Sequence, residues 1–185
     1  SDFVTCMTTV QFSNLEDGAH ILQMRSEDNV GNVGPYPASF TWTVDTTPPA
    51  TSLNSATDGN KSAVTSGGTT KSTSMTFTFS GTDTGGVDHF ECSLDNSNFT
   101  MCISPIQFTS VNLDDGTHTF RVLSEDNSTN KDPSPEAFTW TVDTVSPSTT
   151  VVSAIDGNRT SIQADGNSSS NSMTFAFSAN DTGGD

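Results

Sequence analysis

Residues 40–45 read FTWTVD, and the same six letters return 98 positions later at residues 138–143. In both copies Phe, Trp and Val alternate with Thr and Asp, which is the period of a β-strand with one buried face. A proline-containing linker follows each copy, TTPP at 46–49 and TVSP at 144–147. Because proline lacks the N–H that a strand ladder needs, each copy is predicted to be the last strand of a repeat.

The 98-residue period divides the 185-residue chain into one complete repeat and two halves. Residues 1–45 correspond to residues 97–143 with a two-residue deletion, so they form the C-terminal half of a repeat. Residues 46–143 form the complete repeat, and residues 144–185 form the N-terminal half of a further one. Either a longer chain of tandem repeats has been cut here, or the half-domains of neighbouring copies complete each other.

The complete repeat contains seven segments in which apolar and polar residues alternate. They lie at residues 50–56, 75–79, 90–94, 99–102, 106–109, 118–122 and 138–142. The Gly/Ser/Thr-rich stretch 58–74 is predicted to be a loop, and Asp-Thr-Gly-Gly at 83–86 a hairpin turn. Short strands with turn signals between them, and no helical period, predict an all-β fold of tandem immunoglobulin-like β-sandwiches.

Several blocks of the repeat carry a resemblance. They are FECSLD at 90–95, Cys102, LDDGTHTF at 113–120, SEDN at 124–127 and the closing FTWTVD-T-x-x-P. In these blocks the chain resembles the bacterial-type Ig-like tandem repeat domains of large extracellular surface, adhesin or filament proteins, and the resemblance covers the whole chain. It implies a secreted, multi-domain rod located outside the cell or at the cell surface. It leaves the ligand open, because such repeats serve as stalks as often as tips.

The charge of the chain limits its partners. Asp and Glu outnumber Lys and Arg by 22 to 6, which gives a net charge of −16. Such a surface repels the phosphates of nucleic acids and anionic lipids, so neither nucleic acid nor a membrane is an expected partner. No apolar stretch approaches the roughly 18 residues of a membrane helix, so any export signal or membrane anchor is expected outside this sequence.

The three cysteines indicate an oxidising compartment. Cys92 and Cys102 are separated by nine residues on two predicted successive strands, a spacing that a disulfide across a hairpin can span. Two buried thiols are the alternative. Cys6 corresponds to Cys102, so its expected partner is the counterpart of Cys92, either outside this chain or in a neighbouring copy.

Asn-x-Ser/Thr sequons mark candidate sites for covalently attached glycans: Asn60, Asn98, Asn127, Asn158, Asn167 and Asn180. About four would arise by chance in a chain so rich in Asn, Ser and Thr. Asn60 and Asn158 stand out because they occupy equivalent positions, each in Asp-Gly-Asn followed by Lys or Arg. This sequence predicts an exposed turn, which is either glycosylated or simply tight.

Acidic residues gather near the repeat boundaries and point to Ca²⁺ as the one candidate cofactor. The candidate ligands are Asp45 with Glu27 and Asp28 in one copy, and Asp143 with Glu125 and Asp126 in the other. Hard oxygen ligands at a linker suit calcium, and the resemblance to adhesin rods implies it as well. The spacing of an EF-hand is missing, so solvated acidic turns are the alternative.

The chain is not expected to be an enzyme. His20 and His118 occupy the same position in two repeats, which is typical of a structural histidine, and motifs for nucleophiles, phosphate loops and zinc proteases are missing. Two classes of function remain: a structural filament, stalk or surface-layer rod that associates with copies of itself, or a cell-adhesion or carbohydrate-binding module. The aromatic residues fall mainly at alternating core positions rather than in a sugar-binding platform, which favours the structural class.

Overall fold

The computed structural model describes residues 3–110 and 113–181. Within these residues the chain forms strands, and no helix that is long and apolar enough to cross a membrane is found there. The strands are β1 (Gly18–Met24), β2 (Ala38–Val44), β3 (Ala50–Asp58), β4 (Gly68–Thr70), β5 (Met75–Thr82), β6 (Val87–Leu94), β7 (Thr100–Cys102), β8 (Ile106–Phe108), β9 (Gly116–Asp126), β10 (Glu136–Val142), β11 (Ser148–Asp156) and β12 (Met173–Asn180). The all-β fold class predicted from the sequence is confirmed.

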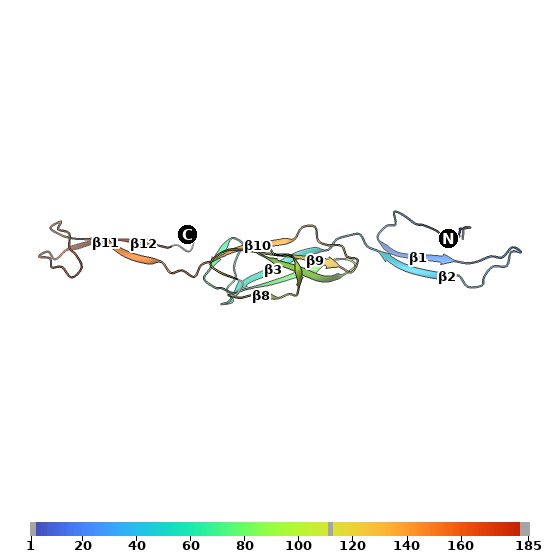
Figure 1. The fold of residues 1–185 in the computed structure, drawn as a ribbon, viewed down its shortest axis with the longest axis horizontal. Coiled ribbons are helices and arrows are strands. Elements are labelled where there is room, and N and C mark those ends of the chain that lie inside the picture. The colour runs from blue at the N-terminus through green and yellow to red at the C-terminus, as the bar shows by residue number, and fades with distance from the viewer. Residues whose placement is uncertain (1–2, 111–112, 182–185) are drawn as a thin grey trace.

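Strands β3 to β10 make a two-layer sandwich in the middle of the molecule (Figure 1). One sheet has the order β3-β5-β8 and the other has the order β4-β10-β9-β6-β7. All neighbouring strands run antiparallel except β4 and β10, which are parallel. The two sheets pack face to face because each presents one apolar face that only the other can cover.

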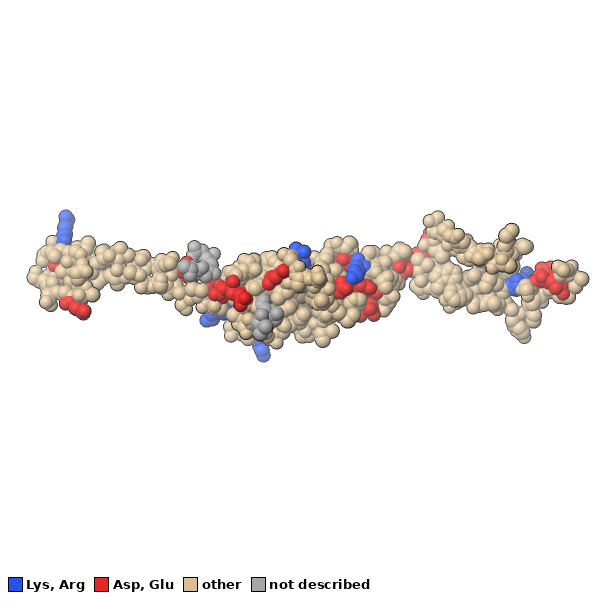
Figure 2. Space-filling view, in the orientation of Figure 1, with Lys and Arg blue, Asp and Glu red and all other residues tan. Residues whose placement is uncertain are grey.

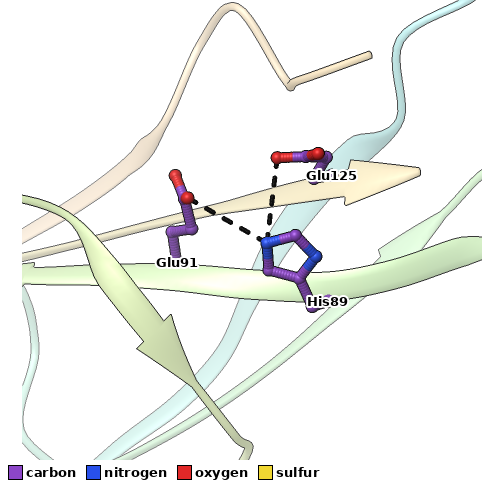
Figure 3. A group of neighbouring side chains, drawn as sticks. All are labelled: His89, Glu91 and Glu125. Atoms are coloured by element: carbon purple, nitrogen blue, oxygen red, sulfur yellow. Dashed lines mark ion pairs between the residues drawn. The ribbon is translucent and has the colours of Figure 1, made fainter. Parts of the chain in front are cut away.

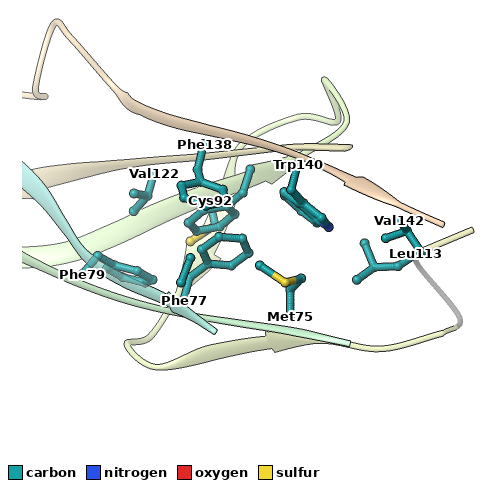
Figure 4. Packing of buried hydrophobic residues seen from close by; sticks show 11 residues of the cluster. Met75, Phe77, Phe79, Cys92, Leu113, Val122, Phe138, Trp140 and Val142 are labelled. Atoms are coloured by element: carbon teal, nitrogen blue, oxygen red, sulfur yellow. The ribbon is translucent and has the colours of Figure 1, made fainter. Parts of the chain in front are cut away.

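A single aromatic core lies between the two layers (Figure 4). Phe77 of β5 stacks on Phe120 of β9 across the layers, with ring centroids 4.3 Å apart. Trp140 of β10 is fully buried and its ring lies 5.3 Å from that of Phe77. Every second residue of β5 and β10 points into this core, so the alternation seen in the sequence becomes burial on one face.

Strand β4 corrects the prediction that residues 58–74 are only a loop. Its three residues pair with β10, from Trp140 opposite Gly68 to Val142 opposite Thr70. The loop is also tied down at its start, where Asp58 accepts hydrogen bonds from the Ser62 amide and the Thr70 hydroxyl. A three-residue strand is too short for an alternating pattern, and its partner lies about 70 residues away in the chain.

The Asp-Thr-Gly-Gly stretch at 83–86 is not the hairpin turn that was predicted. It joins β5 of the three-stranded sheet to β6 of the five-stranded sheet, so the chain changes layers there. The same stretch lies at the end of the sandwich that faces the N-terminal hairpin, where it contacts the preceding repeat.

The two terminal halves form hairpins at opposite ends of the sandwich (Figure 1). The β1–β2 pair has the register of the β9–β10 pair, with Gly18 opposite Val44 as Gly116 is opposite Val142. The β11–β12 pair reproduces the β3–β5 pair, including its bulge, which falls between Val151 and Ser153 instead of Leu53 and Ser55. Equivalent sequences therefore form equivalent strand pairs.

Candidate functional site at the joint between repeats

The linker after β2 is held by the acidic residue that precedes β1. Asp17 Oδ1 accepts hydrogen bonds from the Thr46 amide at 3.0 Å and the Thr46 hydroxyl at 2.8 Å. Asp17 Oδ2 accepts one from the Thr47 hydroxyl at 2.8 Å. The hydroxyls of Thr47 and Thr46, together with the Thr46 amide, lower the pKa of Asp17 because they donate to its charged form. The carboxylate therefore fixes the direction in which the chain leaves the repeat.

The linker after β10 is held in the same way. Asp115 Oδ1 accepts hydrogen bonds from the Thr144 amide at 3.0 Å and the Thr144 hydroxyl at 2.8 Å. Asp143 Oδ1 accepts one from the Val145 amide, just as Asp45 Oδ1 accepts one from the Thr47 amide. The bond from the Thr47 hydroxyl to Asp17 has no counterpart, because Val145 stands at that position. The other hydrogen bonds recur, so the exit from a repeat is a recurring structural element.

Contacts between two repeats centre on Asp45 and the glycines of the 83–86 turn. The Asp45 carboxylate lies against Gly85 so closely that a Cβ on that glycine would collide with it. Asn130 of the central repeat donates a hydrogen bond to the Asp45 carbonyl at 3.1 Å. The side chain of Asn127 stabilises residues 83–86 by donating hydrogen bonds to the carbonyls of Gly85 at 3.0 Å and Gly86 at 3.3 Å. These contacts join the end of one repeat to the start of the next.

A shallow hollow of about 310 Å³ lies at this joint. Both repeats line it, with Asp17, Gly18, Thr43, Val44 and Asp45 on one side and Thr84 and Gly85 on the other. Acidic side chains are seen at the junction between the N-terminal hairpin and the sandwich (Figure 2). One carboxylate oxygen from each of Asp45, Asp83 and Asp126 lies within 4.8 Å of the other two, so these three residues could hold a cation.

This set differs from the candidate calcium ligands chosen from the sequence. In the antiparallel β1–β2 pair, Asp45 follows the end that carries Gly18, whereas Glu27 and Asp28 follow the opposite end at Met24. The β9–β10 register separates Asp143 from Glu125 and Asp126 for the same reason. The structure instead brings Asp45 to Asp126 of the following repeat, so a joint combines acidic residues from two repeats rather than from one.

Four aspartates begin the same kind of five-residue loop: Asp28, Asp58, Asp126 and Asp156. In each loop the carboxylate accepts hydrogen bonds from the amides two and four positions later, and the residue three positions later has a positive φ. Burial opposes ionisation of Asp126, but donors from Asn130 and the amide of Ser128 lower its pKa. The pKa of Asp58 is lowered chiefly by the Ser62 amide. Asp58, Asp126 and Asp156 are buried, so these carboxylates act as structural hydrogen-bond acceptors rather than as free surface charges.

The predicted disulfide between Cys92 and Cys102 is confirmed. It joins β6 to β7, with the two Cα atoms 5.8 Å apart. Cys6 is a free, exposed thiol, and its pairing with a counterpart of Cys92 stays a prediction.

The six sequon asparagines are all exposed in the structure. Asn60 and Asn158 lie at the same place in the loops that start at Asp58 and Asp156, as the repeat predicted. The side-chain nitrogen, which a glycan would modify, donates to the carbonyls of Gly85 and Gly86 at the joint in Asn127, and to the Ser169 hydroxyl at 3.5 Å in Asn158. Glycosylation stays a prediction at all six positions, and at Asn127 it would disrupt the joint.

His118 is buried and both of its ring nitrogens face acceptors. Nδ1 lies 2.7 Å from Asp95 Oδ2 and Nε2 lies 2.8 Å from the Asp114 carbonyl. Burial of the ring opposes its charge, but the Asp114 carbonyl and the Asp95 carboxylate raise the pKa of His118 above its usual value. His20 makes the equivalent contact with the Glu16 carbonyl. The structural role predicted for this histidine position agrees with these bonds.

The sequence does not identify Asp83, Gly85 and Asn130 as residues of the joint. Asp83 and Gly85 are predicted only as parts of a turn, and nothing in the sequence indicates that these residues approach the preceding repeat. The recurrence of Asp-Thr-Gly-Gly at 83–86 and 181–184 was the available signal. Comparison of the chain with protein-family models and with curated proteins found no match.

Proposed function

We propose that this chain is part of a structural extracellular rod, in which Ig-like β-sandwich repeats follow one another and have no catalytic role. The proposal rests on the joint between repeats. There the linker is held by the same hydrogen bonds in two successive repeats, between Asp17 and Thr46 and between Asp115 and Thr144. A clamped proline linker limits bending between repeats, which is what a stalk or filament requires. The disulfide supports a location outside the cell, since such bonds persist in oxidising compartments.

The joint can be tested by small-angle X-ray scattering of the chain in solution. We expect an extended particle with a narrow distribution of lengths. Gly85→Ala places a methyl group against the Asp45 carboxylate and should broaden that distribution without unfolding the sandwich. Gly34→Ala is the matched control, because its added Cβ meets only ordinary contacts. A wild-type chain that scatters as freely jointed bodies would contradict the proposal.

The terminal hairpins support the idea that whole repeats are the assembled unit. The β1–β2 hairpin corresponds to β9–β10 and leaves Phe40 exposed, while β11–β12 corresponds to β3–β5 and leaves Phe177 exposed. The N-terminal hairpin therefore corresponds to part of the five-stranded sheet, and the C-terminal hairpin corresponds to part of the three-stranded sheet. We propose that these faces are covered by the complementary half of a repeat, supplied by the same polypeptide or by a neighbouring copy.

The mass of the native chain, denatured with and without reductant, distinguishes the two sources. A mass far above 19.5 kDa indicates tandem repeats in one polypeptide. A mass near 19.5 kDa indicates completion by neighbouring copies, and the chain should then form head-to-tail oligomers. If the chain is a monodisperse monomer and the amides of both hairpins resist hydrogen exchange, the hairpins need no complementary half-repeat from either source, and the proposal is wrong.

We also propose that Ca²⁺ binds at the joint through Asp45, Asp83 and Asp126, whose carboxylate oxygens suit a hard cation. Bound calcium would neutralise the repulsion among these groups and stiffen the linker. Adding calcium should raise the unfolding temperature and narrow the distribution of lengths, and Asp83→Asn should weaken both effects. If a chelator and excess calcium give the same scattering and the same unfolding temperature, the proposal is wrong.

A further inference from the structure

Three potential metal ligands meet on the outer face of the five-stranded sheet (Figure 3). His89 and Glu91 stand two positions apart on β6, so they point to the same side of the sheet, and Glu125 lies on the neighbouring strand β9. One ligand atom from each residue lies within 4.8 Å of the other two. This cluster is separate from the acidic residues of the joint.

His89 belongs to the regular part of the β6–β9 pairing. It lies opposite Glu125, and the register continues without interruption from there to Leu94 opposite Phe120. Phe90 packs against the core, so its neighbours His89 and Glu91 point to the outer face, beside the Glu125 carboxylate. The β-bulge of β6 lies just before His89, where Val87 is opposite Asp126.

The orientation of the imidazole is set by Asp88. His89 Nδ1 lies 2.8 Å from Asp88 Oδ2, and because an ionised carboxylate can only accept, Nδ1 carries the proton of that bond. Nε2 is the nitrogen that faces the two glutamates, at 4.0 Å from Glu91 Oε1 and 3.7 Å from Glu125 Oε2. A carboxylate that holds the far nitrogen of a histidine is the usual support for a metal-binding imidazole.

A lysine now provides the positive charge between the two glutamates. Lys131 Nζ lies 2.8 Å from Glu91 Oε2 and 3.3 Å from Glu125 Oε2. Its side chain is half exposed, so it can move into solvent without opening the core. The corresponding position in the first repeat is Val33, which forms the same isolated bridge with Glu27 as Lys131 does with Glu125. The fold therefore does not require a lysine at this position.

We propose that His89, Glu91 and Glu125 bind a divalent first-row transition ion of the Zn²⁺ class, with Asp88 as a positioning residue and Lys131 as a displaceable counter-ion. Donor atoms bound about 2.0–2.2 Å from one such ion lie roughly 3–3.5 Å from each other. Rotation of the two glutamate side chains is enough to reach that spacing from the observed distances. An imidazole with two carboxylates suits this class of ion, whereas Ca²⁺ takes oxygen ligands.

The ion would join β6 to β9 on the face opposite the aromatic core. The disulfide ties β6 to β7, so the metal would fasten the other side of β6. This inference stands apart from the proposed structural function, because the joint does not depend on these residues.

Titration of the whole chain with Zn²⁺ by isothermal calorimetry tests the site. We expect one tight ion per chain, a tenfold or greater loss of affinity in His89→Gln and Glu125→Gln, and roughly tenfold weaker binding in Asp88→Asn. Lys131→Val should bind Zn²⁺ about five- to tenfold more tightly, because it removes the competing charge. A simple ion-pair cluster predicts no gain of affinity in this variant.

One further variant serves as a control. His20→Gln removes a histidine elsewhere in the chain and should not alter Zn²⁺ affinity at this site. The inference is overturned if neither wild type nor Lys131→Val shows saturable binding. It is also overturned if His89→Gln and Glu125→Gln, folded by circular dichroism, bind as tightly as wild type.

Discussion

Strands β2 and β10 contain the same five letters, FTWTV, and each is followed by an aspartate, yet the two strands differ in what they bury. Both pair antiparallel with the preceding strand in the same register. In β10 Phe138 is 7% exposed and Trp140 is fully buried, whereas in β2 Phe40 is 62% exposed. The exposure differs because β10 is covered by a second sheet, in which Phe77 of β5 packs against Trp140. A local pattern is thus sufficient for a strand and its register, while the core needs a second sheet.

The other end of the molecule gives the same contrast. Phe79 of β5 is 4% exposed and its counterpart Phe177 of β12 is 68% exposed, although the two strand pairs share their register and their bulge. The central repeat should therefore unfold as one cooperative unit, whereas the two hairpins are marginal by themselves. The central repeat and the hairpins are therefore expected to respond differently to equivalent substitutions.

The largest effect is expected for tryptophan truncation. Trp140→Ala removes a fully buried ring and should lower the free energy of unfolding of the central repeat by about 3–5 kcal/mol in urea titrations. Trp42→Ala should have much less effect. Trp140→Phe is the control, because Trp140 Nε1 donates no hydrogen bond to the residues that the structure describes, so mainly packing is lost. Equal costs for Trp42 and Trp140 would show that the N-terminal half is completed by a second layer.

Removal of the disulfide is expected to have the second-largest effect on the stability of the central repeat. Cys92→Ser or Cys102→Ser opens a short loop between β6 and β7 and should cost roughly 3 kcal/mol of central-repeat stability. Cys6→Ser should leave that transition unchanged, because Cys6 is exposed and free. If reductant leaves the urea midpoint of the wild type unchanged, the disulfide does not contribute to stability as expected.

A smaller effect is expected at the aspartate loops, and it depends on pH. The folded protein holds the pKa of Asp126 below its unfolded value, so the ionised carboxylate stabilises the fold above about pH 4. That contribution should be lost as the pH falls below about 4 and passes through the lowered pKa of Asp126. Asp126→Asn should reduce the pH dependence of central-repeat stability in this window, whereas Asp28→Asn should affect only the N-terminal hairpin. Identical acid profiles for wild type and Asp126→Asn would contradict this role.

The smallest effect is expected for His118. Its pKa is raised by folding, so the charged ring stabilises the fold fully below about pH 6.5, and this contribution is lost as the pH rises through the raised pKa. His118→Gln should therefore cost about 1 kcal/mol at pH 5.5 and less at pH 9. Nuclear magnetic resonance titration of the ring provides the direct check. A His118 ring that titrates at or below the usual value would contradict the prediction.

The sequence was informative where interactions are local. Alternation in 75–79 and 138–142 identified β5 and β10, and the short spacing of Cys92 and Cys102 identified the disulfide. It was uninformative for β4, which depends on a partner far along the chain. It was also wrong about the turn at 83–86, because turn residues do not reveal whether the next strand joins the same sheet or the opposite one.

The candidate sites divide in the same way. The sequence showed that acidic residues gather near the repeat boundaries, but it grouped Asp45 with the wrong partners, since strand direction decides which ends meet. Glu125 was predicted to be a calcium ligand near Asp143, but the sequence did not join it to His89 and Glu91. Those two residues lie on β6, and they meet Glu125 only because β6 pairs with β9. Which strands become neighbours in a sheet depends on the tertiary fold and leaves no mark in the pattern of residue types.

By itself the sequence determined the all-β class, the 98-residue period and most strands of the central repeat, and it favoured the disulfide that the structure shows. These features follow from contacts between residues close in the chain or from repetition, both of which can be read along one dimension. Only the tertiary structure decided which layer each strand joins, which copy of FTWTVD is buried, and which charged residues meet across strands and repeats. Those outcomes depend on distant segments that pack together, because burial and electrostatic contact are properties of neighbours in space.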